Sequence, residues 1–208
     1  MKKAIRKFAV ATTTFCALVF ASCSTDDSPF EPVNPEPVNG DLEGNLTEDL
    51  TLDPAVDYKL TGSFLVKAGA TLTIPAGTKI VADVSPDSYI VIEKGAKIDV
   101  KGTASQPVVM TSANAQPGDW GGLLLLGDAP SSEGVDLTGE VAGVIYGGTN
   151  PADNSGSIKY LVIEGAGAQI NAESQYNGLT LYAVGSGTVI DNVAILNGSD
   201  DGVEFFGG

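Results

Sequence analysis

Histidine is absent from this chain of 208 residues. Catalytic Ser-His or Cys-His pairs, histidine-bound zinc and a histidine pH switch are therefore excluded. Cations are scarce as well, because 11 lysines and arginines stand against 26 aspartates and glutamates, a formal net charge of −15 at pH 7. Proteins that bind nucleic acid usually carry a basic face, so we expect no nucleic acid among the partners.

Cysteine is rare, and both copies lie near the N-terminus, at Cys16 and Cys23. Residues 1–22 begin with four cations and continue with an apolar stretch of about fifteen residues, shorter than the roughly 20 that cross a bilayer. This pattern predicts a secretory signal peptide over residues 1–22. Removal of that peptide takes Cys16 away, so the mature chain cannot form an internal disulfide.

The small residues that lead to Cys23 resemble a bacterial lipoprotein signal, in which the cysteine becomes the lipidated first residue. An ordinary signal peptide is the alternative. Residues 23–45 are acidic and contain four prolines. This composition indicates a tether. The acidic start over residues 24–27 resembles an export signal of Gram-negative surface lipoproteins. We therefore expect a lipid anchor in the outer membrane that faces the cell exterior, with a periplasm-facing anchor as the alternative.

Residues 46–208 lack the apolar period of a helix, because glycine, threonine and asparagine interrupt every short apolar run. This pattern predicts an all-β domain. Its runs also repeat at offsets of 24 to 32 residues. The similar pairs are Val66–Ile74 with Ile92–Val100, Ile158–Ile163 with Ile190–Ile195, and Asn177–Tyr182 with Asp201–Phe206, and Gly121–Leu126 is a looser relative of the last pair.

Such offsets favour a parallel β-helix, in which each coil bonds to the next about 4.8 Å away, and they predict about six coils. Alternation would direct Leu179 and Leu181 inward above their equivalents Val203 and Phe205, with Thr180 and Glu204 in water. A β-sandwich is the competing architecture. It would use the Asn-Gly and Asp-Gly dipeptides at 177 and 201 as hairpin turns.

Four segments carry a family resemblance, namely Gly62–Thr78, Gly102–Ser112, Gly118–Gly122 and Asp200–Gly208. They resemble bacterial surface lipoproteins with a right-handed parallel β-helix of the pectin-lyase-like type. The resemblance implies that fold over nearly all of residues 45–208, and further coils beyond Gly208. The final apolar strand carries no polar cap, so we expect its exposed edge to associate with a partner.

The densest polar cluster comprises Asp200, Asp201 and Glu204, whose oxygens are the kind of ligand that calcium prefers. A simple turn is the alternative for the two aspartates. Asp119 and Trp120 form the second candidate, a platform on which a sugar ring could stack. Packing at a coil corner is the alternative for this tryptophan, the only one in the chain. No residue is predicted to be catalytic.

Three functions follow from these residues. The leading hypothesis is a lipid-anchored, non-catalytic binding or structural module. Its partner would be a glycan, a surface protein or other surface material. The second is a polysaccharide lyase or glycoside hydrolase of the pectin-lyase-like fold. The third is a scaffold stabilised by calcium, the one cofactor that the sequence suggests.

Overall fold

The computed structural model describes residues 40–139 and 143–208. The predicted signal peptide, Cys23 and most of the predicted tether lie outside the described residues. The described part of the chain contains strands and no α-helix, so none of it forms an apolar helix of the length that membrane crossing needs.

The described strands are β1 (Asp41–Leu46), β2 (Leu50–Thr51), β3 (Tyr58–Val66), β4 (Thr71–Pro75), β5 (Lys79–Ala82), β6 (Tyr89–Ile92), β7 (Lys97–Lys101), β8 (Val108–Ser112), β9 (Leu123–Leu126), β10 (Leu137–Thr138), β11 (Ile145–Tyr146), β12 (Gly156–Glu164), β13 (Leu179–Tyr182), β14 (Val189–Leu196) and β15 (Val203–Phe206).

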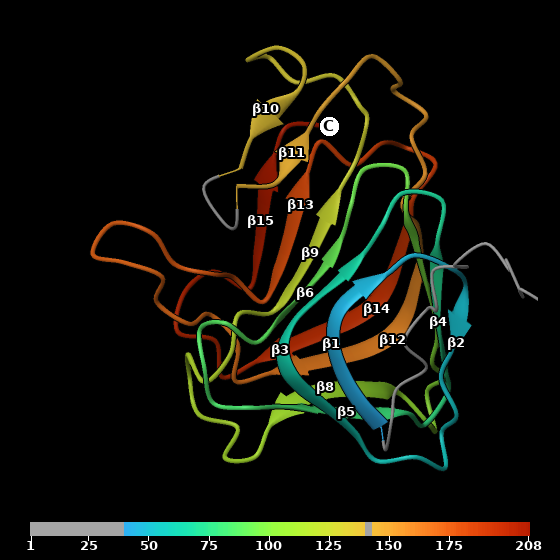
Figure 1. Ribbon diagram of the computed structural model, residues 1–208, viewed down its shortest axis with the longest axis vertical. Coiled ribbons are helices and arrows are strands. Elements are labelled where there is room, and N and C mark those ends of the chain that lie inside the picture. The colour runs from blue at the N-terminus through green and yellow to red at the C-terminus, as the bar shows by residue number, and fades with distance from the viewer. Residues whose placement is uncertain (1–39, 140–142) are drawn as a thin grey trace, which may run out of the picture. The chain divides into compact units, whose positions relative to one another are not determined.

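All of these strands except β10 and β11 form one sheet of 13 strands in parallel pairs, wound into three faces (Figure 1). Face A consists of β5, β8 and one half each of β1, β3, β12 and β14. Face B consists of β6, β9, β13, β15 and the other halves of β1 and β3. Face C consists of β2, β4, β7 and the first halves of β12 and β14. The chain visits the faces in the order A, B, C, which is the course of a parallel β-helix.

Two strands turn the corner from face C to face A at a single residue. Tyr160 in β12 and Asn192 in β14 have positive φ angles of 51° and 56°. They occupy equivalent places in adjacent coils, because the residues on either side of them pair in register. A left-handed residue redirects the strand without an inserted loop, and asparagine adopts this conformation more readily than most residues.

The sequence repeats are vertical neighbours in the coils. Leu179 pairs with Val203 and Leu181 with Phe205. Val66 pairs with Ile92. The remaining predicted matches, at Ile158–Ile163 with Ile190–Ile195 and at the looser relative Leu123–Leu126, are also paired in register. The prediction of an all-β parallel β-helix is therefore confirmed, and no pair forms the hairpin that a β-sandwich would need.

Alternation along each strand separates the core from the outer surface. In β7, Ile98 and Val100 are buried, whereas Lys97 and Lys101 are exposed. The inward side chains of successive coils make one apolar cluster that extends along the interior. Each large aliphatic residue buried there contributes about 1.5–3 kcal/mol, so the interior column supplies most of the driving force for winding the chain.

Face B carries a second layer on its outer side, which the sequence did not predict. The segment between β9 and β12 folds back and brings the antiparallel pair β10–β11 outside β9, β13 and β15 (Figure 1). Tyr146 and Tyr182 belong to the apolar cluster beneath it. The Lys94 ammonium binds this segment through the Asp136 carboxylate at 2.6 Å and the Gly147 carbonyl at 3.1 Å.

The expectation that Thr180 and Glu204 face water is wrong for Thr180. Thr180 points outward as predicted but is only 1% exposed, so water does not reach this part of the outer side of face B. Glu204, one coil further, is half-buried. The first strand, β1, starts at Asp41 and so includes the last residues of the predicted tether.

The corner at Gly122 requires glycine. Gly122 has a φ of +89°, and a Cβ there would lie 2.1 Å from the Asn177 carbonyl oxygen of the next coil. Any side chain at this position would push the coils apart.

We predict that Leu125→Ala lowers the free energy of unfolding by about 2–5 kcal/mol, because Leu125 is fully buried between coils. The matched control is Leu196→Ala. Leu196 is 48% exposed, so its truncation should cost about 0.5 kcal/mol or less. Urea unfolding measures both variants, and equal losses would contradict the assignment of the interior column.

Candidate functional site

The predicted calcium ligands do not converge. Asp200 and Asp201 are exposed, and the Glu204 carboxylate accepts a hydrogen bond from the Asn177 amide. No group of three or more acidic or cysteine side chains that could hold a metal ion occurs among residues 40–139 and 143–208. The backbone of this corner bonds to the previous coil, from the Ser199 amide to the Ala166 carbonyl at 3.1 Å. The two aspartates lie exposed in the connection between β14 and β15.

Trp120 packs inside a coil corner. Its side chain is fully buried, and its indole N–H donates to the Glu164 backbone carbonyl at 2.9 Å. Asp119 is nearly buried, and its carboxylate accepts bonds from the Ser112 hydroxyl at 2.5 Å and the Gln116 amide at 3.0 Å. The indole offers no face to a sugar ring. The stacking platform is therefore replaced by the packing alternative, because the corner loops of three coils meet around this ring.

A row of polar side chains on the outer side of face C is the site that the sequence reasoning missed. Thr51 pairs with Thr73, Thr73 with Asp99, and Asp99 with Ser157, so four successive coils each contribute one polar group. Their neighbours along the strands, such as Leu72 and Ile98, point into the core. A signal was present, since Thr73 and Asp99 occupy the same place in the predicted 26-residue repeat.

A groove of about 290 Å³ meets this row at Asp99 and Ser157. Its polar lining groups are a threonine hydroxyl, a serine hydroxyl, an amide, an ammonium and a carboxylate, from Thr71, Ser157, Asn154, Lys97 and Asp99. These groups donate and accept hydrogen bonds in close succession. Such a lining suits a ligand with many hydroxyl groups better than an apolar one.

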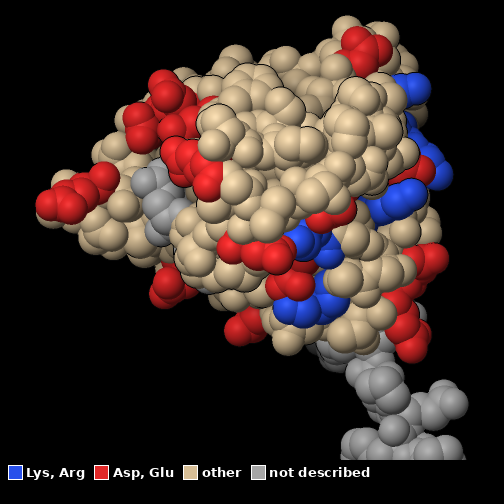
Figure 2. Space-filling view, turned by 90° about the horizontal axis from the view of Figure 1, so that it is seen from above, with Lys and Arg blue, Asp and Glu red and all other residues tan. Residues whose placement is uncertain are grey.

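The charge of face C differs from that of the whole chain. Three lysines point outward here, Lys97, Lys101 and Lys159, against the two aspartates Asp99 and Asp191. Lys101 forms an ion pair with Asp99 at 2.9 Å. In the view of Figure 2, the lysines lie in the right half of the molecule, mixed with acids, whereas the left half shows acids and no lysine. Face C is therefore close to neutral on a strongly acidic protein.

Glu164 binds neighbouring coils rather than a ligand. One carboxylate oxygen accepts from the Thr111 hydroxyl at 3.3 Å and the other from the Asn197 amide at 3.4 Å. Together with Asp119, it satisfies polar groups of the corner between faces A and B. The outward row of face C is thus the better candidate for contact with another molecule.

The fluorescence of Trp120 tests whether its ring is buried in the coil corner. We predict a blue-shifted emission maximum in the native protein and little quenching by iodide, because the ring has no exposed surface. Unfolding in urea should shift the emission to the red and make it quenchable. Strong quenching of the native protein would contradict the buried position.

We predict that the folded protein loses stability at high pH because of Tyr176. Burial, and next the adjacent Tyr89 ring at 5.2 Å, raise the pKa of the Tyr176 phenol. The unfolded chain releases this proton above pH about 10 whereas the folded protein retains it, so stability falls as pH rises past that point. Tyr176→Phe should lose less stability between pH 8 and pH 11 in urea unfolding. A loss as steep as in the unchanged protein would assign the effect to other groups.

One comparison with known proteins agrees with this geometry. Neither the curated proteins nor the solved structures contain a match to the chain. The family model of the pectate-lyase-like β-helix domain matches residues 44–208, which include almost all of the wound strands. The chain therefore belongs to the family of pectate-lyase-like β-helix domains.

Proposed function

We propose that the protein is a lipid-anchored β-helix at the outer cell surface that binds glycans, or other hydroxyl-rich surface material, without catalysis. The observation that carries this proposal is the in-register polar row Thr51, Thr73, Asp99 and Ser157 beside the groove on face C. The predicted signal peptide and Cys23 support the anchor.

The spacing of the row suits a chain of sugars. Equivalent side chains on successive coils lie about 4.8 Å apart, and outward residues along one strand lie about 6.6 Å apart. Both spacings are comparable to the separation of hydroxyl groups on neighbouring sugar rings. The parallel backbone holds these groups rigidly, so binding costs the protein little conformational entropy.

Each contact in such a groove is weak. A hydrogen bond exchanged with water contributes about 0.5–1.5 kcal/mol net. Useful affinity therefore requires several coils to act together on one extended ligand. The repeated row meets this requirement, and a single sugar should bind poorly.

The groove favours binding over bond cleavage. Glycoside hydrolysis uses two carboxyl groups on opposite sides of the scissile bond. Among the described residues that line the groove, Asp99 is the one carboxylate, and it is ion-paired with Lys101. The family name includes pectate lyase, so cleavage of polyuronates belongs in the same experiment as binding.

The test is retention of the lipid-free protein on a glycan array and on immobilised polyuronates. We predict that Thr71→Arg and Ser157→Arg each weaken retention on the best ligands at least about tenfold, because both residues line the groove and the long side chain fills it. Ser105→Arg is the matched control. Ser105 is exposed on a loop outside the row, and its substitution should leave retention unchanged.

Cleavage is scored on the same ligands through new reducing ends and unsaturated products. No product is expected. If neither groove variant weakens retention, the binding site does not lie on face C. If products form, the protein is an enzyme and the proposal of a non-catalytic binding module is wrong.

A further inference from the structure

A second groove lies at the corner where the chain turns from face C to face A. It has a volume of about 350 Å³, and we call it the corner groove. Its lining comes from the connection between β7 and β8 and from the corners of β12 and β14, and it includes Thr103, Pro107, Tyr160, Val162 and Asn192. The groove therefore combines apolar surface with a hydroxyl, a phenol and an amide.

The corner groove exists because successive coils turn this corner differently. Residues 102–107 form a loop between β7 and β8, whereas β12 and β14 each turn on one residue, Tyr160 and Asn192. Most of the loop is exposed, and it forms one wall of the groove beside the tight corner of β12. Tyr160 has a coil on each side, because β12 pairs with β7 and β8 on one side and with β14 on the other.

Tyrosine is an unusual residue for the backbone conformation at position 160. Its φ of 51° is strained for a bulky side chain, and Asn192 shows that asparagine serves at the equivalent place in the next coil. Strained residues of this kind gather at sites that hold ligands. The turn alone does not explain the tyrosine, which indicates that its side chain has a use.

The ring of Tyr160 has no partner in the protein. Four of the six tyrosines of the chain are buried, and Tyr89 stacks on Tyr176. Tyr160 is half-buried, and its side chain forms no ring stack and no hydrogen bond within residues 40–139 and 143–208. A partly exposed aromatic ring offers a large rigid surface to the apolar face of a sugar ring.

The corner groove continues the groove on face C. Ser157 lines the groove on face C and Tyr160 lines the corner groove, and both lie on β12, roughly 10 Å apart along the strand. Between them, Lys159 is exposed and forms no ion pair in the part of the chain that the structure describes. Its ammonium can donate to a hydroxyl group of a ligand. An extended ligand on face C therefore reaches Tyr160 along the surface of one strand.

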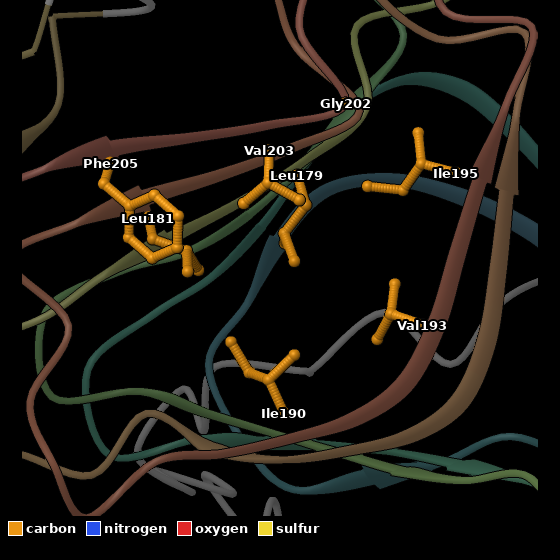
Figure 3. Close-up of a pocket in the computed structure, with 8 residues that line it drawn as sticks. All are labelled: Leu179, Leu181, Ile190, Val193, Ile195, Gly202, Val203 and Phe205. Atoms are coloured by element: carbon orange, nitrogen blue, oxygen red, sulfur yellow. The ribbon is translucent and has the colours of Figure 1, made fainter.

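An apolar cavity elsewhere does not compete for such a ligand. It has a volume of about 520 Å³ and lies among side chains of β13, β14 and β15, which point into one common space (Figure 3). Its lining side chains are hydrocarbons, and the cavity continues the interior column. It has no side-chain donor or acceptor that would orient a hydroxyl-rich ligand.

We propose that Tyr160 is a stacking platform for one sugar ring of a glycan chain whose neighbouring rings lie in the groove on face C. This inference rests on the proposed function and narrows its ligand. The Thr103 hydroxyl and the Asn192 amide bind hydroxyl groups at the edge of the stacked ring. No charged side chain is among the described residues that line the corner groove, so the stacked ring is a neutral sugar.

The test measures retention of the lipid-free protein on neutral glycans of increasing length. Tyr160→Asn, which copies Asn192, should weaken retention on long chains at least about tenfold, and the loss should grow with chain length until a ligand spans both grooves. Its melting temperature should stay equal or rise, because asparagine adopts a positive φ more readily than tyrosine. Tyr160→Phe keeps the ring and should hold retention within about twofold.

Val81→Asn is the matched control. Val81 is a half-buried residue in β5 of face A that lines neither groove, and its substitution should leave retention unchanged. Retention that is weakened by Thr71→Arg but not by Tyr160→Asn would overturn the stacking platform and leave binding on face C in place. Equal losses in Tyr160→Asn and Tyr160→Phe would also overturn the platform, because the ring would then not be the binding group. A protein retained on no glycan would overturn the proposed function together with the platform.

Discussion

The structure depends on the stacking of inward apolar side chains in register from coil to coil. Leu123, Leu179 and Val203 occupy one such column across three coils of face B. Because side chains alternate along a strand, a slip of one residue would exchange the core for the outer surface. This constraint explains why the amino-acid sequences of the strands repeat although the connecting loops differ in length.

The same constraint leaves the outer positions free to vary, and the three faces use them differently. The outer side of face B is covered by the segment that carries β10 and β11 and by residues of the connection before β13, such as Tyr176. Face C stays open and presents Thr73, Asp99 and Ser157 in one row. Its near balance of charge makes it the outer face best suited to a hydroxyl-rich ligand on this acidic protein.

The sequence by itself determined the parallel β-helix, because vertical neighbours must resemble one another, as Leu181 and Phe205 do. Tertiary structure alone decided the burial of Thr180 and the place of Trp120, since the alternation of the strand does not set the first and loops of other coils meet at the second. The groove on face C was likewise decided by winding, which aligns Asp99 and Ser157 although 58 positions separate them. Alternation is a local property of a strand, whereas the cover over its outer side is not.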